Sequence, residues 1–183
     1  MNLSKSLTRV SLITATLLLV PLVAMQFTAE VNWSPLDFIV MGALLFSVGL
    51  ALELVASRRG PVVYRLAAAG AVLTTLLLVW SNLAVGFIGS GPNAANLLCG
   101  AVPLLALGGA LMGRFQARSM AYATGAAALL QLLVPVVALL VSHIEVKPQE
   151  WGISVVFAAF WLGSAWLFQR ADTSNGSLNQ RLA

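Results

Sequence analysis

The sequence predicts an all-α membrane protein, a polytopic helical bundle with six transmembrane helices. Of its 183 residues, 60% are apolar and only 9% are charged, and the mean hydropathy is +0.93. Soluble domains carry about 25% charged residues, so an ordinary soluble domain is excluded. The apolar residues also fall in blocks of about 17–25, the length that crosses a bilayer core. Because Cys99 is the only cysteine, an intrachain disulfide framework is excluded as well.

Six apolar stretches are separated by short polar breaks. In hydrocarbon every backbone polar group must be paired within its own segment, so stretches of this length are interpreted as helices. The expected helices are residues 10–27, 36–56, 66–88, 95–113, 120–142 and 151–168. They form a transmembrane domain over residues 10–170, with an N-terminal tail at 1–9. The polar composition of residues 171–183 predicts a disordered C-terminal tail.

The basic residues predict the orientation. Positive side chains stay on the cytoplasmic side of a membrane. With six helices, nine of the ten Lys and Arg residues share the face that carries both termini, and only Lys147 lies opposite. Both termini are therefore expected in the cytoplasm. The formal charge of +4 follows from this orientation and from contact with anionic lipid, so it does not indicate nucleic acid.

The chain carries a candidate threefold repeat. The run Leu-Leu-Val-Pro at 18–21 recurs at 132–135, and as Leu-Leu-Val-Trp at 77–80. A glycine follows each run 28 residues later, at Gly49, Gly108 and Gly163. The repeat predicts three helical hairpins, 9–58, 65–118 and 118–170, related by a pseudo-threefold axis along the membrane normal. The alternative is a chance match within a chain rich in Leu, Val and Ala.

The repeat aligns Asp37, Asn96 and Trp151 at the start of the three return helices. Asp and Asn there are typical N-cap residues, which accept hydrogen bonds from the free amides of a first helical turn. For Asp37 and Asn96 we therefore favour capping over ligand binding.

Several membrane chemistries are excluded by residue type. His143 is the only histidine, so two histidines cannot hold a haem. The two lysines lie outside the expected helices, which excludes a retinal Schiff base. The one acidic residue well inside an expected helix, Glu53, lies near Arg58 and is explained by pairing with it. No nucleophile, base and orienting group converge, so the sequence predicts no enzyme, no cofactor and no metal site.

Polar side chains inside the expected helices are few. Asn82 and Gln131 are the strongest, and an amide in hydrocarbon usually bonds to a neighbouring helix. Together with Thr74 and Thr75 they are also the candidate lining of a polar pathway. Pro21 and Pro135 predict kinks. The pairs Gly109/Gly113 and Ala159/Gly163 have the spacing of close helix contacts, which in a chain with 15 glycines is weak evidence for a dimer.

The outer face collects the remaining candidates. Residues 86–96 form a glycine-rich turn whose backbone amides either face a ligand or serve the turn itself, and the second reading is favoured. Ser90 and His143 are expected on the same outer face, which suggests an intramembrane serine protease. The Gly-x-Ser-Gly motif of such a protease would need glycine at position 88, where the chain has Ile88, so this function is not favoured. The outer acidic residues and His143 lack the spacing that is diagnostic of divalent-metal ligands, so we interpret them as solvated loop charges. The candidate outer-face site residues are Glu30, Asp37, Asn93, Asn96 and His143.

Three short segments carry a resemblance: Trp33-Ser34-Pro35-Leu36-Asp37-Phe38, Ala84-Val85-Gly86-Phe87-Ile88-Gly89 and Asn93-Ala94-Ala95-Asn96. With them, most of the chain resembles a family of small bacterial inner-membrane proteins to which no activity is attached. The resemblance implies a bacterial cytoplasmic membrane and no site.

Two function classes remain open from the sequence. The first is a non-enzymatic accessory or structural subunit that packs against a membrane-protein partner, or against itself, through small-residue helix faces. The alternative is a small transporter or channel for a neutral or apolar solute, because no mid-membrane charge is present to couple transport to ions.

Overall fold

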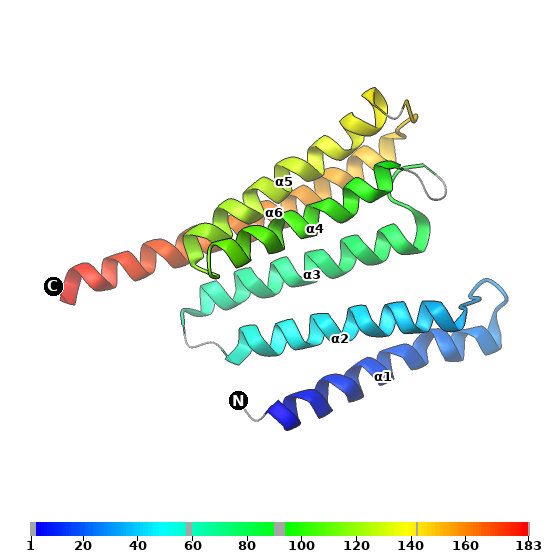
Figure 1. The fold of residues 1–183 in the computed structure, drawn as a ribbon, viewed down its shortest axis with the longest axis horizontal. Helices are drawn as coiled ribbons and strands as arrows, with labels where there is room; N and C mark the ends of the chain where they lie inside the picture. The colour runs from blue at the N-terminus through cyan, green and yellow to red at the C-terminus, as the bar shows by residue number, and fades with distance from the viewer. Residues whose placement is uncertain (1–2, 58–59, 90–93, 142, 183) are drawn as a thin grey trace. The chain divides into compact units, whose positions relative to one another are not determined.

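The protein is all-helical. The computed structural model describes residues 3–57, 60–89, 94–141 and 143–182, and within them six helices follow one another with short connections (Figure 1). They are α1 (Leu3–Phe27), α2 (Pro35–Ser57), α3 (Val62–Val85), α4 (Ala94–Met112), α5 (Ala117–Leu140) and α6 (Pro148–Leu182). The chain divides into two compact units, Met1–Arg59 (unit 1) and Gly60–Ala183 (unit 2), and each is described by itself.

The helices extend into both segments that were expected to be tails. α1 begins at Leu3, so most of the expected tail 1–9 belongs to its first turns, and α6 continues to Leu182 through the segment expected to be disordered. A polar composition excludes a bilayer span, but it does not exclude a helix. No proline follows Pro148, so nothing in the second half of α6 removes a backbone donor.

Five helices of the described chain are long and apolar enough to cross a membrane. The five segments are Ser4–Phe27, Pro35–Ser57, Val62–Ala84, Ala117–Leu140 and Pro148–Thr173. The apolar part of α4, Asn96–Met112, is shorter. The sixth crossing therefore depends on α4.

Unit 1 is a hairpin of α1 and α2. The two helices approach closely at Gly49, where an added Cβ would lie 2.6 Å from Cγ1 of Val10. Val10 and Val48 are buried, whereas most other apolar side chains of the hairpin are exposed or half-buried. A large apolar surface of this kind is what a helix presents to lipid or to another protein.

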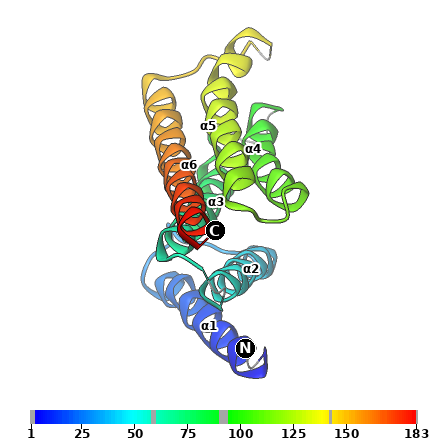
Figure 2. The same ribbon diagram turned by 90° about the vertical axis from the view of Figure 1, so that its left-hand side faces the viewer.

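Unit 2 packs four helices. α5 and α6 make the most extensive contact, α4 packs on α5, and α3 packs on α6. Figure 2 shows α6 and α5 running side by side in this unit. The predicted pairing of the third helix with the fourth is the smallest of these contacts, because each of the two packs mainly on a different neighbour. The threefold repeat stays a prediction.

The core of unit 2 is one contiguous cluster of buried residues. Leu78, Val102, Phe157 and Trp161 are among its largest members, and they come from α3, α4 and α6. Near the short α4–α5 connection, the hydroxyl of Tyr64 donates to the carbonyl of Phe115 at 2.7 Å, and its ring meets Phe168 edge-on. These contacts join α3, the connection and α6.

Candidate functional site

Gln131 is the central polar residue inside unit 2. It lies on the buried face of α5, one turn from Ala127 and Ala128 on one side and from Val134 and Pro135 on the other. Its side chain is 0% exposed, and neither Nε2 nor Oε1 has a hydrogen-bond partner. Because Pro135 has no N–H, the carbonyl of Gln131 also lacks its helical donor. The expected bond from this amide to a neighbouring helix is therefore not present.

Two residues of α6 share this property. Ser154 and Trp161 are both 0% exposed, and neither Ser154 Oγ nor Trp161 Nε1 has a partner. Trp161 packs in the same cluster as Ala127, Ala128 and Val134, the residues that flank Gln131. Ser154 lies on the same buried face of α6, two turns before Trp161. Gln131, Ser154 and Trp161 form what is called below the interior polar cluster.

The depth of each residue along the α5–α6 hairpin supports this grouping. At a rise of 1.5 Å per residue, Gln131 lies about 14 Å from the end of α5, and Ser154 and Trp161 lie about 9 and 20 Å into α6. Gln131 is thus level with the stretch between the two α6 residues. Each buried polar group without a partner lowers the free energy of unfolding by about 1–3 kcal/mol, so the cluster destabilises an otherwise apolar core.

The threonines inside unit 2 behave differently. Thr74 donates to the carbonyl of Gly70 at 2.8 Å, Thr75 to that of Ala71 at 3.0 Å, and Thr124 to that of Met120 at 2.8 Å. These hydroxyls are satisfied by their own helices, as is usual for threonine inside a helix. Thr74 and Thr75 therefore need no ligand, in contrast to the interior polar cluster.

Asn82 and Asn96 organise the turn at 86–89. Asn82 Nδ2 donates to the carbonyl of Asn96 at 3.0 Å, which joins α3 to α4. Asn96 Oδ1 accepts hydrogen bonds from the backbone amides of Phe87 and Ile88, both at 2.9 Å. Asn82 Oδ1 is buried without a partner. The amides of this part of the turn thus serve the fold itself, in line with the favoured reading.

Glu150 completes the same end of unit 2. Its Oε1 accepts from the amide of Gly89 at 3.1 Å and its Oε2 from the amide of Lys147 at 3.0 Å, while the residue is 9% exposed. Gly89 has φ of 65°, a conformation that favours glycine. One carboxylate therefore ties the 86–89 turn to the start of α6. The contact between Glu150 and Gly89 joins positions 61 residues apart, so no local sequence motif predicts it.

The return helices share a feature at their third residue. Asp37 in α2, Asn96 in α4 and Glu150 in α6 each occupy that position, and each accepts backbone amides through a side-chain oxygen. The prediction that Asp37 and Asn96 are N-caps is wrong in position. Ser34 caps α2, because its amide and hydroxyl donate to Asp37 Oδ2 while its Oγ accepts from the Asp37 amide, a reciprocal capping box. In α6 the third residue is Glu150, one position before the predicted Trp151.

The remaining outer-face candidates form no described cluster. Glu30 and His143 are exposed, and His143 has φ of 51°. Asn93 and Ser90 lie outside the described residues. Among the residues that the structure does describe, no group of three or more His, Cys, Asp or Glu side chains is placed to hold a metal ion.

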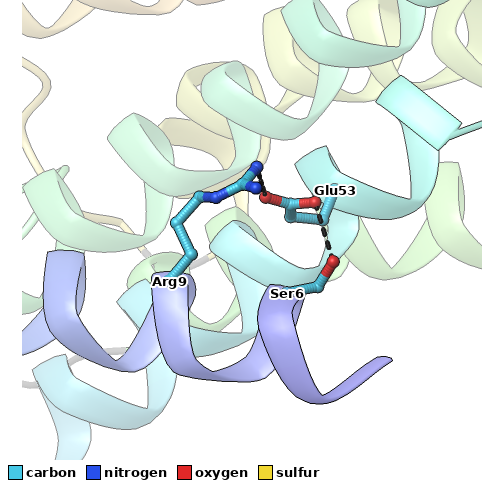
Figure 3. A network of polar contacts seen from close by, with 3 residues as sticks. All are labelled: Ser6, Arg9 and Glu53. Carbon is cyan, nitrogen blue, oxygen red and sulfur yellow. Dashed lines mark hydrogen bonds and ion pairs between the residues drawn. The ribbon is translucent and has the colours of Figure 1, made fainter. Parts of the chain in front are cut away.

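Glu53 joins the two helices of unit 1. Its Oε1 lies 2.8 Å from Nη1 of Arg9, and Ser6 Oγ donates to its Oε2 at 3.1 Å (Figure 3). The expected partner, Arg58, lies outside the described residues. Because the Arg9 side chain is 64% exposed, the ion pair stabilises the hairpin by less than about 1 kcal/mol. We interpret this network as a structural contact between α1 and α2.

The two small-residue motifs have different surroundings. An added Cβ at Gly109 would lie 2.6 Å from Cβ of Ala123, and one at Gly113 would meet Ser119. This motif is therefore used inside the chain, between α4 and α5, and it does not leave a free face for a dimer. Ala159 and Gly163 are exposed, and an added Cβ at Gly163 meets nothing within 4 Å.

Comparison with protein-family models, with curated proteins and with solved structures finds no match for this chain. The fold and the site themselves define the class: an all-helical protein with five helices able to span a membrane. Its second unit encloses uncharged polar groups in an apolar core.

Proposed function

We propose that the protein is an integral membrane subunit of a bacterial cytoplasmic membrane, without enzymatic activity, that packs against a partner helix through the exposed face of α6. All six helices cross the bilayer and both termini lie in the cytoplasm. For α4, 19 residues give about 28 Å at 1.5 Å per residue, close to the hydrocarbon thickness. The nine-to-one split of basic residues supports this topology.

The exposed face of α6 is the observation that carries the proposal. Gly152, Val156, Ala159 and Gly163 are exposed and follow one another at intervals of four, three and four residues, opposite the buried face of the helix. Added Cβ atoms at Gly152 and Gly163 would meet nothing within 4 Å. In lipid there is no hydrophobic drive between helices, so small residues that let backbones approach closely mark the contact surface.

The closed core of unit 2 also supports the proposed subunit role. Gln131, Ser154 and Trp161 are fully buried, so the described chain has no polar path open to either end of unit 2 at these residues. A subunit needs a closed core and a free face, and both are present. The alternative of a transporter for a neutral solute is favoured by the unpartnered groups of the interior polar cluster alone.

The test is a tagged full-length chain isolated from native membranes in mild detergent, with the variant Gly163→Leu. The leucine fills the α6 face without a clash inside the chain, so the fold is kept and the complex is lost. Gly108→Leu is the matched control, because its added Cβ also meets nothing within 4 Å but lies on α4. A wild-type chain that migrates alone, or a complex that survives Gly163→Leu, contradicts the proposal.

A further inference from the structure

We propose that the interior polar cluster of Gln131, Ser154 and Trp161 is a binding site, between α5 and α6, for a small uncharged molecule that both donates and accepts hydrogen bonds. Water is the smallest such molecule. The site is separate from the exposed face of α6, so the proposed binding site can be tested independently of the proposed subunit role.

The hydrogen-bonding inventory carries the inference. The Gln131 amide offers two N–H donors and an acceptor, Trp161 offers one donor, and Ser154 offers a hydroxyl. None of these groups has a partner, and all three residues are 0% exposed. Buried polar groups in folded proteins are nearly always paired, either with protein or with an ordered small molecule such as water. Three such groups on the buried faces of α5 and α6, which pack on each other, therefore point to an occupant.

The geometry of Ser154 supports an occupant outside its own helix. The buried threonine hydroxyls of unit 2, those of Thr74 and Thr124, donate to carbonyls of their own helices. Ser154 Oγ makes no such bond, so its own helix does not satisfy it. The carbonyl of Gln131 is a further free acceptor, because Pro135, four residues later, has no N–H to donate to it. This carbonyl lies on α5, whereas Ser154 lies on α6.

Charge limits the class of ligand. The sequence has no charged residue between Arg65 and Arg114, between Arg118 and His143, or between Glu150 and Arg170. The one buried carboxylate described in unit 2, Glu150, lies one turn before Ser154, and its two oxygens already accept from the amides of Gly89 and Lys147. The rest of the core of unit 2 offers no counter-charge, and a bare ion in such surroundings is strongly disfavoured. The ligand is neutral, and it is small because Ala127, Ala128 and Phe157 already pack around the cluster.

The experiment reads the indole N–H of Trp161 by NMR in the full-length chain, solubilised in deuterated detergent and labelled with ¹⁵N-tryptophan. Resident water gives a cross-peak between this N–H and water in the wild type, and Gln131→Met weakens or removes it. A saturable shift of the same resonance on titration with urea or glycerol identifies a solute in place of water. A Trp161 N–H with neither response overturns the proposal.

Thermal stability gives an independent sign. If the cluster is dry, Gln131→Met removes an unsatisfied amide and raises the Tm. If an occupant bridges the cluster, the same variant breaks the bridge, leaves Ser154 and Trp161 unpaired, and lowers the Tm. Thr124→Val is the matched control, because that hydroxyl lies on the same face of α5 and bonds to Met120 of its own helix. A Tm that rises in Gln131→Met, relative to this control, overturns the proposal.

Discussion

Gly109 is the position where the packing of unit 2 can be tested most sharply. An added Cβ there would lie 2.6 Å from Cβ of Ala123 and 3.4 Å from its Cα. Carbon atoms in good contact are about 3.5–4.0 Å apart, so Gly109→Ala falls short by about 1 Å. Neither atom of Ala123 belongs to a flexible side-chain end that can rotate away. α4 and α5 must therefore separate.

The neighbouring residue supplies the control for the magnitude. Overpacking costs about 1–3 kcal/mol, whereas replacing glycine by alanine inside a helix gains about 1 kcal/mol. At Gly108 an added Cβ meets nothing within 4 Å, so only the gain applies. The free energies of unfolding of Gly108→Ala and Gly109→Ala should therefore differ by about 1–3 kcal/mol, with Gly109→Ala the less stable. The intrinsic helix preference cancels in this difference.

The assay is unfolding of the full-length chain in detergent by titration with sodium dodecyl sulfate, followed by circular dichroism. Both variants have the same charge and the same composition, so detergent binding is matched. If Gly109→Ala is as stable as Gly108→Ala, the close approach of α4 and α5 at this glycine is wrong, and with it the internal role of the Gly109/Gly113 motif.

Three further predictions concern the polar contacts. Asn96→Leu leaves the amides of Phe87 and Ile88 without an acceptor and should lower the free energy of unfolding by about 1–3 kcal/mol per amide, whereas Asn96→Asp retains an acceptor; equal losses in the two variants would contradict the contact. Glu53→Gln should lower it by less than about 1 kcal/mol, and by less still in high salt, so a large loss that ignores salt would show that the carboxylate has another role. Ser34→Ala should cost about 0.5–2 kcal/mol and speed amide hydrogen exchange in the first turn of α2; unchanged exchange there would refute the capping box.

The helices are the part of the fold that the sequence predicts well. Apolar blocks of bilayer length leave the backbone no alternative to internal hydrogen bonds, so each predicted stretch has a helix near it. The start of α2 could also have been predicted from the sequence. Proline favours the first position of a helix, so Pro35 indicates Ser34 as the N-cap and Asp37 as its partner three residues later. The repeat alignment instead indicated Asp37 as the N-cap.

The tertiary contacts of polar residues could not be predicted in the same way. The reach of Glu150 to Gly89 and of Asn96 to the 86–88 amides depends on which turns lie together, and periodicity carries no such information. Ser154 and Trp161 were missed as site residues because both types are common in apolar helices. Only their shared face on α6, and the absence of partners, set them apart.

The proposed function requires that α4 crosses the membrane, which would give six spans with both termini inside. The direct measurement is labelling of single cysteines with a membrane-impermeant maleimide, in a Cys99→Ala background, on intact and permeabilised cells. Exposed positions in four connections are used: Glu30, Gly60, Gln116 and Glu145. Positions 30 and 145 should be labelled in intact cells, and positions 60 and 116 only after permeabilisation. Labelling of position 116 in intact cells, with 60 still protected, would show that α4 does not cross.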